Sequence, residues 1–467
     1  MTLVEPLESP PDAVDIFRRL AHLPHVVFFD SAVRGGPTGR YSFVAADPIR
    51  WWNSPDELDD LATVASHWST SQGSDDVRPD LPPFQGGLAG MFGYELAPCF
   101  ERVPLAKMDE FRLPPLAVGW YDVVVAFDHE QNAAWLISQG WPETEAAARR
   151  ERAAQRLTQF RKLLEGEVST ATGESQRGLT SLALSELSPQ HPTGVEHLTS
   201  NFSPAEYLRA VRRAIEYVHA GDVFQVNLAQ RLLHPAHGSP IDLYCRLRER
   251  NPAPMAGYLD GGGWQVASAS PERFLSVVDR QVETRPIKGT APLTRDAAAD
   301  RASGHELILS VKNRAENVMI VDLMRNDLTR SCRPASVRVT QLCGLEHYAW
   351  VQHLVSVVEG TLRDDRTPFD LLRYAFPGGS VTGAPKIRAM EIIAELEPTV
   401  RGPYCGSLGY LGVGGRMDTN ILIRTITAAR GWWQIPVGGG IVADSDPDQE
   451  YEETWHKAKG MLQALRA

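Results

Sequence analysis

The chain has 467 residues, of which 43% are hydrophobic and 22% charged, so it is long enough for one large or two intergrown globular domains. Its net charge of −11 argues against nucleic acid as a partner, because binding a phosphate backbone requires a basic face. A small anionic substrate remains compatible with this charge, since a local pocket can oppose the sign of the whole molecule.

The N-terminus and the cysteines indicate the compartment. Residues 1–17 carry acidic side chains and three prolines and lack the apolar core of a signal peptide. No apolar run in the chain approaches the roughly 18 residues that a membrane span requires. The five cysteines are odd in number and lack the spacing of a zinc site or a disulfide framework. We therefore expect a soluble, cytoplasmic protein with reduced thiols and no membrane partner.

Short β-type runs alternate with glycine and proline between residues 26 and 138, and the runs 122–127 and 134–137 predict a hairpin. A stretch rich in Ala, Arg, Glu and Leu over 142–167 then predicts a helix. The Ser/Thr/Gly/Pro-rich segment after it predicts a linker. We thus expect three consecutive parts: an N-terminal region over 1–167, a linker over 168–201 and a second region over 202–467.

The second region begins with strong helix signals. Ser203 is a candidate N-cap, proline follows it, Glu206 completes a capping box, and Gly221 ends the apolar periodicity. A longer helix is predicted over 305–324, with one apolar stripe. The stripe comprises Ile308, Val311, Ala315, Val318 and Met319.

Further along, alternation over 420–427, a turn at 430–431 and the run 432–435 predict another hairpin. Strands and helices are mixed without the regular β-α-β rhythm of a doubly wound fold. The sequence therefore predicts an α+β architecture with largely antiparallel sheets.

Lys288 lies between Pro286 and Gly289, two residues that fix the backbone and let it approach a ligand closely. A lysine stripped of solvent loses basicity and becomes an amine nucleophile, and Glu272 is a candidate proton donor. The alternative is a surface lysine in a turn.

Several carboxylates occur at helical spacing. Glu316 belongs to the predicted helix over 305–324, and Glu450 and Glu453 are related as i and i+3. Taken one at a time, such residues usually face solvent or interact with the dipole at the start of a helix. Read together, they suit Mg²⁺, which takes a few carboxylate oxygens and keeps several waters.

Gly438, Gly439 and Gly440 directly follow a predicted strand, where exposed amides suit an anion and a tight bulge is the rival interpretation. Arg424, on the predicted hairpin strand, requires an anionic partner, either a ligand or a structural salt bridge. The run 377–386 superficially matches a phosphate loop, but Pro385 precedes its lysine and no Lys-Ser/Thr pair follows, which excludes that motif.

Taken together, these runs resemble the chorismate-utilising enzymes, which include anthranilate, aminodeoxychorismate, isochorismate and salicylate synthases. The matching stretches are dense in the second region: 222–231, 270–273, 286–290, 315–327, 376–386, 404–407, 417–419 and 438–447. They are thinner before it: 29–31, 39–42 and 84–94. The resemblance implies an α+β fold of two face-packed, largely antiparallel sheets with outer helices, and an N-terminal region intergrown with a chorismate-binding catalytic domain over 202–467.

The resemblance also implies the site residues. Glu316, Glu450 and Glu453 would hold Mg²⁺ against the ring carboxylate of chorismate. Glu272 would be the general acid for the departing C4 hydroxyl, which is a poor leaving group. The remaining residues would line the substrate site: Gln225, Thr290, His353, Tyr404, Arg424, Gly439, Gly440 and Lys457.

Two positions separate the members of the family. Relatives that add water carry a lysine in place of Gln225, which cannot act as a base, and anthranilate synthases typically carry alanine in place of Lys288. The resemblance therefore implies an aminodeoxychorismate synthase component I, in which Lys288 adds covalently to the ring before ammonia replaces it. Anthranilate synthase component I is the alternative, and a catalytically inactive binding subunit is the alternative of another class.

Ammonia requires a source. No cysteine lies in the Gly-x-Cys-x-Gly setting of a class I glutaminase, so the resemblance implies a separate glutamine amidotransferase subunit as partner. In some relatives the N-terminal part binds tryptophan. Ser31, Arg40, Tyr41 and Ser42 lie where that pocket would be, although Asp30 replaces the usual glutamate.

Overall fold

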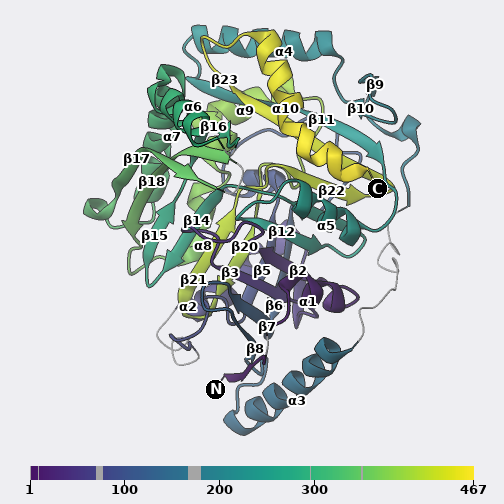
Figure 1. Ribbon diagram of the computed structural model, residues 1–467, viewed down its shortest axis with the longest axis vertical. Coiled ribbons are helices and arrows are strands. Elements are labelled where there is room, and N and C mark those ends of the chain that lie inside the picture. Colours follow the sequence, from purple (N-terminus) through teal and green to yellow (C-terminus); the bar gives the residue numbers. More distant parts are fainter. Residues whose placement is uncertain are drawn as a thin grey trace.

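Two antiparallel sheets form the centre of the molecule, and helices cover their outer faces (Figure 1). The structure is a computed structural model and describes residues 2–8, 10–69, 77–166, 180–294, 296–348 and 351–466. No helix in these ranges is long and apolar enough to cross a bilayer.

The larger sheet has 13 strands within the described residues, in the order β1-β8-β7-β3-β2-β12-β13-β22-β23-β11-β10-β9, with β19 paired to β11. Its strands are β1 (Leu3–Pro6), β2 (Val27–Asp30), β3 (Tyr41–Ala45), β7 (Val123–Asp128), β8 (Ala133–Ser138), β9 (His191–Pro192), β10 (Thr199–Ser200), β11 (Gln225–Pro235), β12 (Ala256–Asp260), β13 (Trp264–Ser268), β19 (Gly383–Ala384), β22 (Thr425–Ala429) and β23 (Trp432–Ile441).

The smaller sheet has 10 described strands in the order β16-β18-β15-β14-β21-β20-β5-β6-β4, with β17 paired to β18. Its strands are β4 (Arg50–Trp52), β5 (Gly87–Phe92), β6 (Leu116–Tyr121), β14 (Arg273–Val278), β15 (Gln281–Thr284), β16 (Ile287–Pro292), β17 (Arg338–His347), β18 (Val351–Thr361), β20 (Ser407–Gly412) and β21 (Arg416–Asn420).

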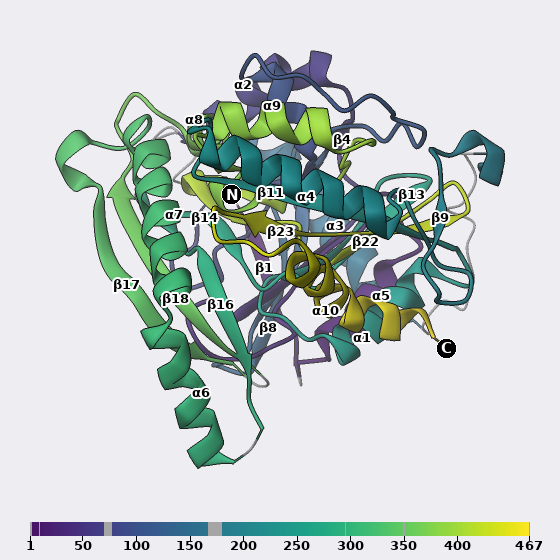
Figure 2. The ribbon, with the colours of Figure 1, turned by 90° about the horizontal axis from the view of Figure 1, so that it is seen from above.

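The helices lie outside the sheets, as the view from above shows (Figure 2). They are α1 (Ala13–Leu20), α2 (Leu58–Ser69), α3 (Ala146–Glu165), α4 (Pro204–His219), α5 (Pro240–Arg250), α6 (Ala297–Leu309), α7 (Val311–Thr329), α8 (Pro368–Ala375), α9 (Lys386–Leu396) and α10 (Pro447–Leu465). Contacts place α5 and α10 on the larger sheet and α6 and α7 on the smaller one.

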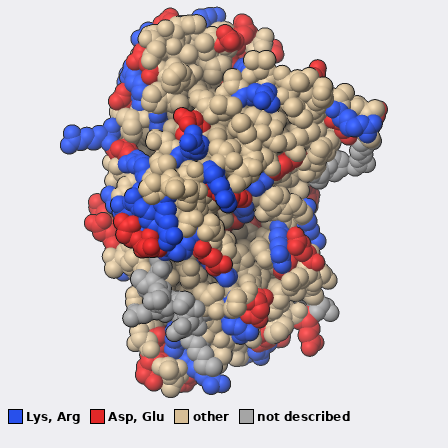
Figure 3. Space-filling model, turned by 90° about the vertical axis from the view of Figure 1, so that its left-hand side faces the viewer, with Lys and Arg blue, Asp and Glu red and all other residues tan. Residues whose placement is uncertain are grey.

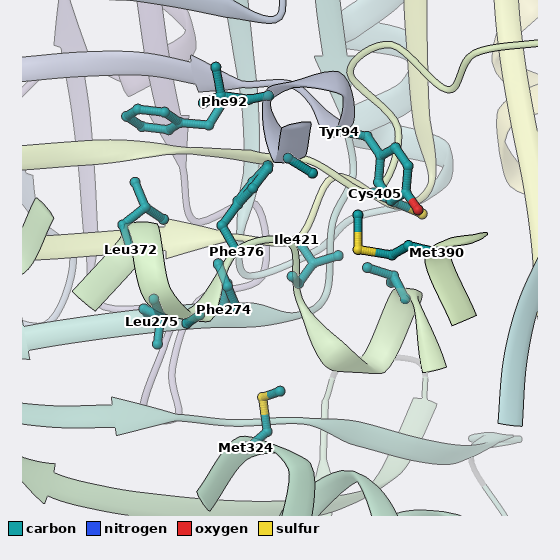
Figure 4. Close-up of a cluster of buried hydrophobic side chains, with 14 of the residues drawn as sticks. Phe92, Tyr94, Phe274, Leu275, Met324, Leu372, Phe376, Met390, Cys405 and Ile421 are labelled. Carbon is teal, nitrogen blue, oxygen red and sulfur yellow. The ribbon is translucent and has the colours of Figure 1, made fainter. Parts of the chain in front are cut away.

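The hydrophobic core is layered in the same way. Side chains from both sheets, such as Phe43 of β3 and Tyr410 of β20, pack between them. Outside the smaller sheet, Figure 4 shows Phe274 of β14 packing among residues from α7, α8 and α9, including Met324 of α7. Each fully buried side chain of this size contributes about 1.5–3 kcal/mol relative to exposure, so this packing fixes the helices that flank the site.

The predicted fold class is confirmed: two antiparallel sheets with outer helices. The predicted hairpin over 122–137 is also present, as β7 paired with β8. The helix after Ser203 is α4, and its capping box forms as expected, with the Ser203 hydroxyl accepting from the Glu206 amide.

The predicted helix over 305–324 is wrong in its bounds. The chain breaks at Ser310, which ends α6 and caps α7 by accepting a hydrogen bond from the Asn313 amide. The predicted apolar stripe is also not the face that packs inward. Met324 and Ile320 are buried, whereas Val311 and Val318 are exposed to solvent.

The predicted strand over 420–427 is likewise interrupted. β21 ends at Asn420 in the smaller sheet and β22 begins at Thr425 in the larger one, so the segment between them crosses from sheet to sheet. Arg424 therefore lies in this crossing, with a left-handed φ of 51°, and not on a hairpin strand. Its backbone conformation is set by the crossover, which strand periodicity does not reveal.

Residues of the N-terminal region join both sheets. β2 pairs with β12 in the larger sheet, and β5 pairs with β20 in the smaller one. The predicted linker over 168–201 begins outside the described residues, and from residue 180 onward it contributes β9 and β10 to the larger sheet.

Candidate active site

A cavity of about 600 Å³ lies where β11 and β23 of the larger sheet approach β16 and β18 of the smaller one, beside α7 and α10. Most of the predicted site residues line it: Glu272, Lys288, Thr290, Glu316, His353, Tyr404, Arg424, Gly440, Glu450, Glu453 and Lys457. Gln225 and Gly439 adjoin the cavity without forming its wall.

Lys288 lies in a β-bulge. Between Ile287 and Thr290, β16 carries one residue more than β18 opposite, and Gly289 takes a φ of 79°. A bulge re-aims a side chain, and here it accompanies a lysine in the wall of the cavity. The Lys288 side chain is 14% exposed, and its Nζ lies 3.9 Å from Glu316 Oε2. Burial lowers the Lys288 pKa, while the Glu316 carboxylate opposes that shift.

Glu272 immediately precedes β14 and is 5% exposed. Ser380 Oγ donates a 2.7 Å hydrogen bond to Glu272 Oε1, and the Ile287 backbone is a further hydrogen-bond partner. Burial raises the pKa of Glu272 to about 7, although Ser380 and Lys288 pull it down. A carboxyl group in this state carries a proton near neutral pH and can donate it.

Thr290 and His353 face each other across β16 and β18. Thr290 Oγ1 and His353 Nδ1 are 2.7 Å apart, which fixes the imidazole ring. Burial, with a contribution from Arg424, lowers the pKa of His353 to about 4. The ring is therefore neutral at physiological pH and presents a hydrogen-bonding group without charge.

Arg424 and Tyr404 line another part of the cavity wall. Among the described residues, the Arg424 guanidinium has neither an ion-pair partner nor a hydrogen bond. The sequence allowed either a ligand or a structural salt bridge as the anionic partner of Arg424. The part of the chain that the structure describes contains no such salt bridge. A half-buried arginine facing a cavity in this state is suited to an anionic ligand.

Helix α10 presents Glu450, Glu453 and Lys457 to the cavity, with Asp446 capping its first turn. Each predicted metal ligand has a lysine nearby. Lys457 Nζ lies 2.6 Å from Glu453 Oε1, and Lys312 Nζ lies 3.5 Å from Glu450 Oε1. Glu316 has Lys288, as described above.

These acids offer hard oxygen donors in one cavity, which is the donor set that Mg²⁺ prefers. Burial and the neighbouring Glu453 both raise the pKa of Glu450, and a divalent cation would relieve that repulsion. Within the described ranges, however, no three acidic, histidine or cysteine side chains converge closely enough to hold an ion as they stand. The magnesium assignment stays a prediction.

The glycine run lies inside β23, paired with β11, and does not follow a strand as predicted. A side chain at Gly440 would meet the Gln225 amide at about 2.9 Å, so Gln225 sits directly behind the wall. A side chain at Gly439 would point at Glu450 Oε2, 3.2 Å away, and at Lys457. The glycines therefore make room for the polar groups of α10 and for a ligand.

A second cavity, of about 350 Å³, lies in the N-terminal part. Ser31, Arg40 and Tyr41 line it, whereas Ser42 lies behind, with its hydroxyl accepting from the Ser31 amide at 3.0 Å. The Asp30 carboxylate in this wall already accepts hydrogen bonds from Tyr244 and Arg248.

Sequence reasoning missed several contributors. Ser380 contacts Glu272 across 108 residues of sequence, and Ser445 donates to Glu450 Oε1 at 2.7 Å. Asn227 and Lys312 also line the cavity. Ser380 belongs to the run 377–386 that was considered as a phosphate loop. The lysine of that run, Lys386, instead pairs with Asp327 at 2.7 Å.

Solved structures share this architecture. Anthranilate synthase component I from Streptococcus pneumoniae is 32% identical, with a TM-score of 0.76, and the match covers 92% of this chain and 93% of that one. The isochorismate synthase MenF from Escherichia coli matches in fold, with a TM-score of 0.72 at 18% identity over 100% of this chain and 94% of that one. The fold is therefore that of the chorismate-utilising enzymes.

Sequence comparison agrees with the fold. Anthranilate synthase component 1 of Thermus thermophilus is 40% identical, covering 99% of this chain and 96% of that protein. Aminodeoxychorismate synthase component 1 of Escherichia coli is 39% identical, covering 96% and 95%. The family described as chorismate binding enzyme matches residues 31–463, and the chain belongs to this family. The names of these relatives divide between two activities and do not decide between them.

Proposed function

We propose that this chain is the chorismate-aminating subunit of an aminodeoxychorismate synthase, which converts chorismate and ammonia to 4-amino-4-deoxychorismate. One observation carries the proposal: a buried lysine, Lys288, faces the same cavity as Glu272, a carboxyl group that holds its proton near neutral pH. A nucleophile and an acid in one enclosed site suit displacement of a hydroxyl group through a covalent intermediate.

The proposed reaction has two allylic displacements. The unprotonated Lys288 amine adds to ring carbon C2, the ring double bond shifts, and the C4 hydroxyl departs as water with a proton from Glu272. Ammonia then adds at C4, the double bond shifts back, and the bond between C2 and Lys288 breaks. The ammonium group formed at C4 returns a proton to Glu272, so both residues end as they began.

The charges of the cavity suit a dianionic substrate. With Glu272 protonated and Lys288 unprotonated, its wall contains three carboxylates, from Glu316, Glu450 and Glu453, and three cations, from Lys312, Arg424 and Lys457. Arg424, which lacks an acidic partner among the described residues, would take one substrate carboxylate. Glu316, Glu450 and Glu453 would hold Mg²⁺, whose charge would balance the other.

Anthranilate synthase component I is the second candidate, because similar proteins bear that name. It differs in needing no lysine nucleophile, since ammonia would attack C2 directly. In either case a separate glutamine amidotransferase subunit would supply ammonia, as the "component 1" in the names of the relatives suggests.

We further propose that the 350 Å³ cavity at Ser31, Arg40 and Tyr41 takes tryptophan.

Product analysis tests the proposal. The purified chain is incubated with chorismate, Mg²⁺ and an ammonium salt at alkaline pH, with and without an added aminodeoxychorismate lyase. We expect 4-amino-4-deoxychorismate by mass spectrometry, and p-aminobenzoate only with lyase. Fluorescent anthranilate without lyase would establish the second candidate instead, and no consumption of chorismate would indicate an inactive binding subunit.

A further inference from the structure

An ion pair between Arg401 and Glu397 is buried behind the wall of the catalytic cavity. Charged side chains usually lie on the surface, as Figure 3 shows for one face of the molecule, but Arg401 is 6% exposed and Glu397 is 4% exposed. Arg401 donates two hydrogen bonds to the Glu397 carboxylate, from Nε at 2.9 Å and from Nη2 at 2.6 Å. Desolvation offsets much of the attraction within a buried ion pair, so stability alone does not account for this one.

The Arg401 guanidinium is bonded to the backbone of two segments that line the cavity. Its Nη1 donates to the Val381 carbonyl at 3.0 Å, and its Nη2 donates to the Asn227 carbonyl at 2.9 Å. Val381 and Asn227 both line the cavity, as does Tyr404, whose ring centroid lies 5.8 Å from the guanidinium carbon. One planar group thus joins β11, the 3₁₀ turn Gly379–Val381 and the segment before β20.

Glu397 and its neighbours hold the guanidinium in place. Besides the two bonds from Arg401, Glu397 Oε1 accepts a 2.9 Å hydrogen bond from the Ala229 amide of β11. The Arg401 backbone is fixed as well, because its amide donates to Glu95 Oε1 at 2.8 Å. The ring centroid of Tyr94 lies 4.7 Å from the guanidinium carbon. The Arg401 fork therefore has little freedom, and the two carbonyls that accept from it are held with it.

The turn that Arg401 anchors also carries the hydrogen-bond partner of the acid. Ser380 directly precedes Val381 in the chain and donates to Glu272 Oε1 at 2.7 Å. A displacement of the Val381 carbonyl would carry Ser380 with it, because a rigid peptide unit links the two residues. The position of the Glu272 carboxyl group therefore depends on a guanidinium that lies outside the cavity.

Groups from three other segments also face Glu272: Lys288 and the Ile287 backbone from β16, Arg424 from the crossing between the sheets, and Cys405 from the segment before β20. A substitution at position 401 that keeps the positive charge leaves the charges of these groups unchanged. A change in the pKa of Glu272 in such a variant therefore reports a change in geometry, and Ser380 is the partner that the anchored turn carries.

We propose that Arg401, held by Glu397, is a positioning residue for acid catalysis, because it anchors the turn from which Ser380 holds Glu272. The inference rests on the proposed function, since it takes Glu272 as the acid for the departing hydroxyl group. Arg401 is not part of the described cavity wall. Its effect reaches the reaction through two hydrogen bonds, from the guanidinium to the Val381 carbonyl and from the Ser380 hydroxyl to the acid.

The test uses the full chain with chorismate, Mg²⁺ and ammonium, and it measures kcat/KM against pH. Arg401→Lys keeps the positive charge but loses the planar fork that reaches both carbonyls. Glu397→Gln is the milder second variant, because it keeps the shape of the side chain and removes the charge that holds the guanidinium. Arg231→Lys is the matched control. Arg231 is 4% exposed, and its side chain donates to Glu110 and Ser188, which lie outside the cavity wall.

We expect Arg401→Lys to lower the rate of amination by about tenfold or more, because a misplaced acid transfers its proton poorly. Its pH profile should fall at higher pH than that of the wild type, since a weaker Ser380 hydrogen bond raises the pKa of Glu272. Combining it with Ser380→Ala should shift the profile no further than Ser380→Ala alone, because both act through one hydrogen bond. Glu397→Gln should give a smaller shift in the same direction, and Arg231→Lys should give none.

Thermal unfolding of each variant separates loss of position from loss of fold, and Glu397→Gln decides the outcome if Arg401→Lys does not fold. An unshifted profile in the folded variants would overturn the inference. So would fully additive shifts in the double variant, or an equal shift in Arg231→Lys. A wild-type chain without amination, or an alkaline fall that Glu272→Gln retains, would instead contradict the proposed function, so the two failures are distinguishable.

Discussion

Burial acts in opposite directions on the two side chains that the proposed chemistry needs. It raises the pKa of Glu272 to about 7 and lowers the pKa of Lys288. In each case the desolvated site disfavours the charged form. The same cavity therefore favours a protonated acid and an unprotonated amine at one pH, which is the combination that attack by lysine with departure of the hydroxyl group as water requires.

The need for a protonated Glu272 predicts that the rate of amination falls on the alkaline side, or limb, of its pH profile. Glu272 must be protonated to act, so the rate per unit of free ammonia should fall as pH rises through about 7. The Ser380 hydrogen bond stabilises the ionised carboxylate and lowers the Glu272 pKa, so Ser380→Ala should move the limb to higher pH. The measurement is kcat/KM against pH with ammonium.

Ser445→Ala is the control for that profile, because Ser445 donates to Glu450 and not to Glu272. It should leave the position of the limb unchanged. Glu272→Gln should remove the limb together with most of the activity. A limb that Glu272→Gln retains would assign the acid to another group.

Sequence reasoning singled out Lys288 and Glu272, which both line the cavity, because an adjacent glycine and family motifs mark them locally. It missed Ser380 as the partner of Glu272, since a hydrogen bond across 108 residues leaves no trace in spacing or periodicity. Arg424 was found as a candidate, but its left-handed backbone and missing salt bridge became visible only in the fold.

At the scale of the elements, local signals predicted helices well where they act alone. The capping box at Ser203 predicted α4, and the i, i+3 spacing of Glu450 and Glu453 is that of the helix found as α10. The prediction failed where tertiary contacts decide. The inward face of α7 is set by packing against β16 and β18, because an amphipathic pattern states only that an apolar face exists, not what covers it.

The proposed magnesium site uses only the face of α10 that lines the cavity, so only substitutions on that face should change the dependence of activity on Mg²⁺. Glu450→Gln and Glu453→Gln each remove an oxygen donor and should raise the Mg²⁺ concentration for half-maximal activity by about tenfold or more. Titration of activity with Mg²⁺ after chelation measures this. Glu452→Gln, an exposed neighbour outside the cavity wall, is the control and should titrate like the wild type. Equal Mg²⁺ titration curves for all three variants would show that α10 does not contribute to the metal site.

Helix α7 predicts unequal stability effects on its two faces. Met324 is 3% exposed and packs in the cluster of Figure 4, so Met324→Ala should lower the free energy of unfolding by about 2–5 kcal/mol. Val318 is 48% exposed, and Val318→Ala should change stability by less than about 0.5 kcal/mol. Denaturant titration compares the two. A larger loss of unfolding free energy for Val318→Ala than for Met324→Ala would show that the opposite face of α7 packs inward.

At the scale of the whole molecule, the two sheets interleave early and late parts of the chain. β2 and β12 pair in the larger sheet, and β5 and β20 pair in the smaller one. Removing the early strands would expose long strand edges and apolar surface on both sheets.

Residues 202–467 expressed alone should therefore fail to fold, although they contain every predicted catalytic, substrate-binding and metal-binding residue of the active site. Far-UV circular dichroism and thermal unfolding of this fragment test the prediction, with the full chain as control. Co-expression of residues 1–201 should recover soluble, folded protein. Cooperative unfolding of the isolated fragment would show that the catalytic region is an independent domain.

The central claim is that Lys288 forms a covalent bond with the ring, and the variant Lys288→Ala tests it most directly. We predict that its rate of C4 amination, with saturating Mg²⁺ and ammonium, falls by several orders of magnitude, while its affinity for chorismate stays close to that of the wild type. Lys288→Arg, which keeps the charge but not the nucleophile, should be equally inactive. Formation of 4-amino-4-deoxychorismate by Lys288→Ala at the wild-type rate would contradict the account.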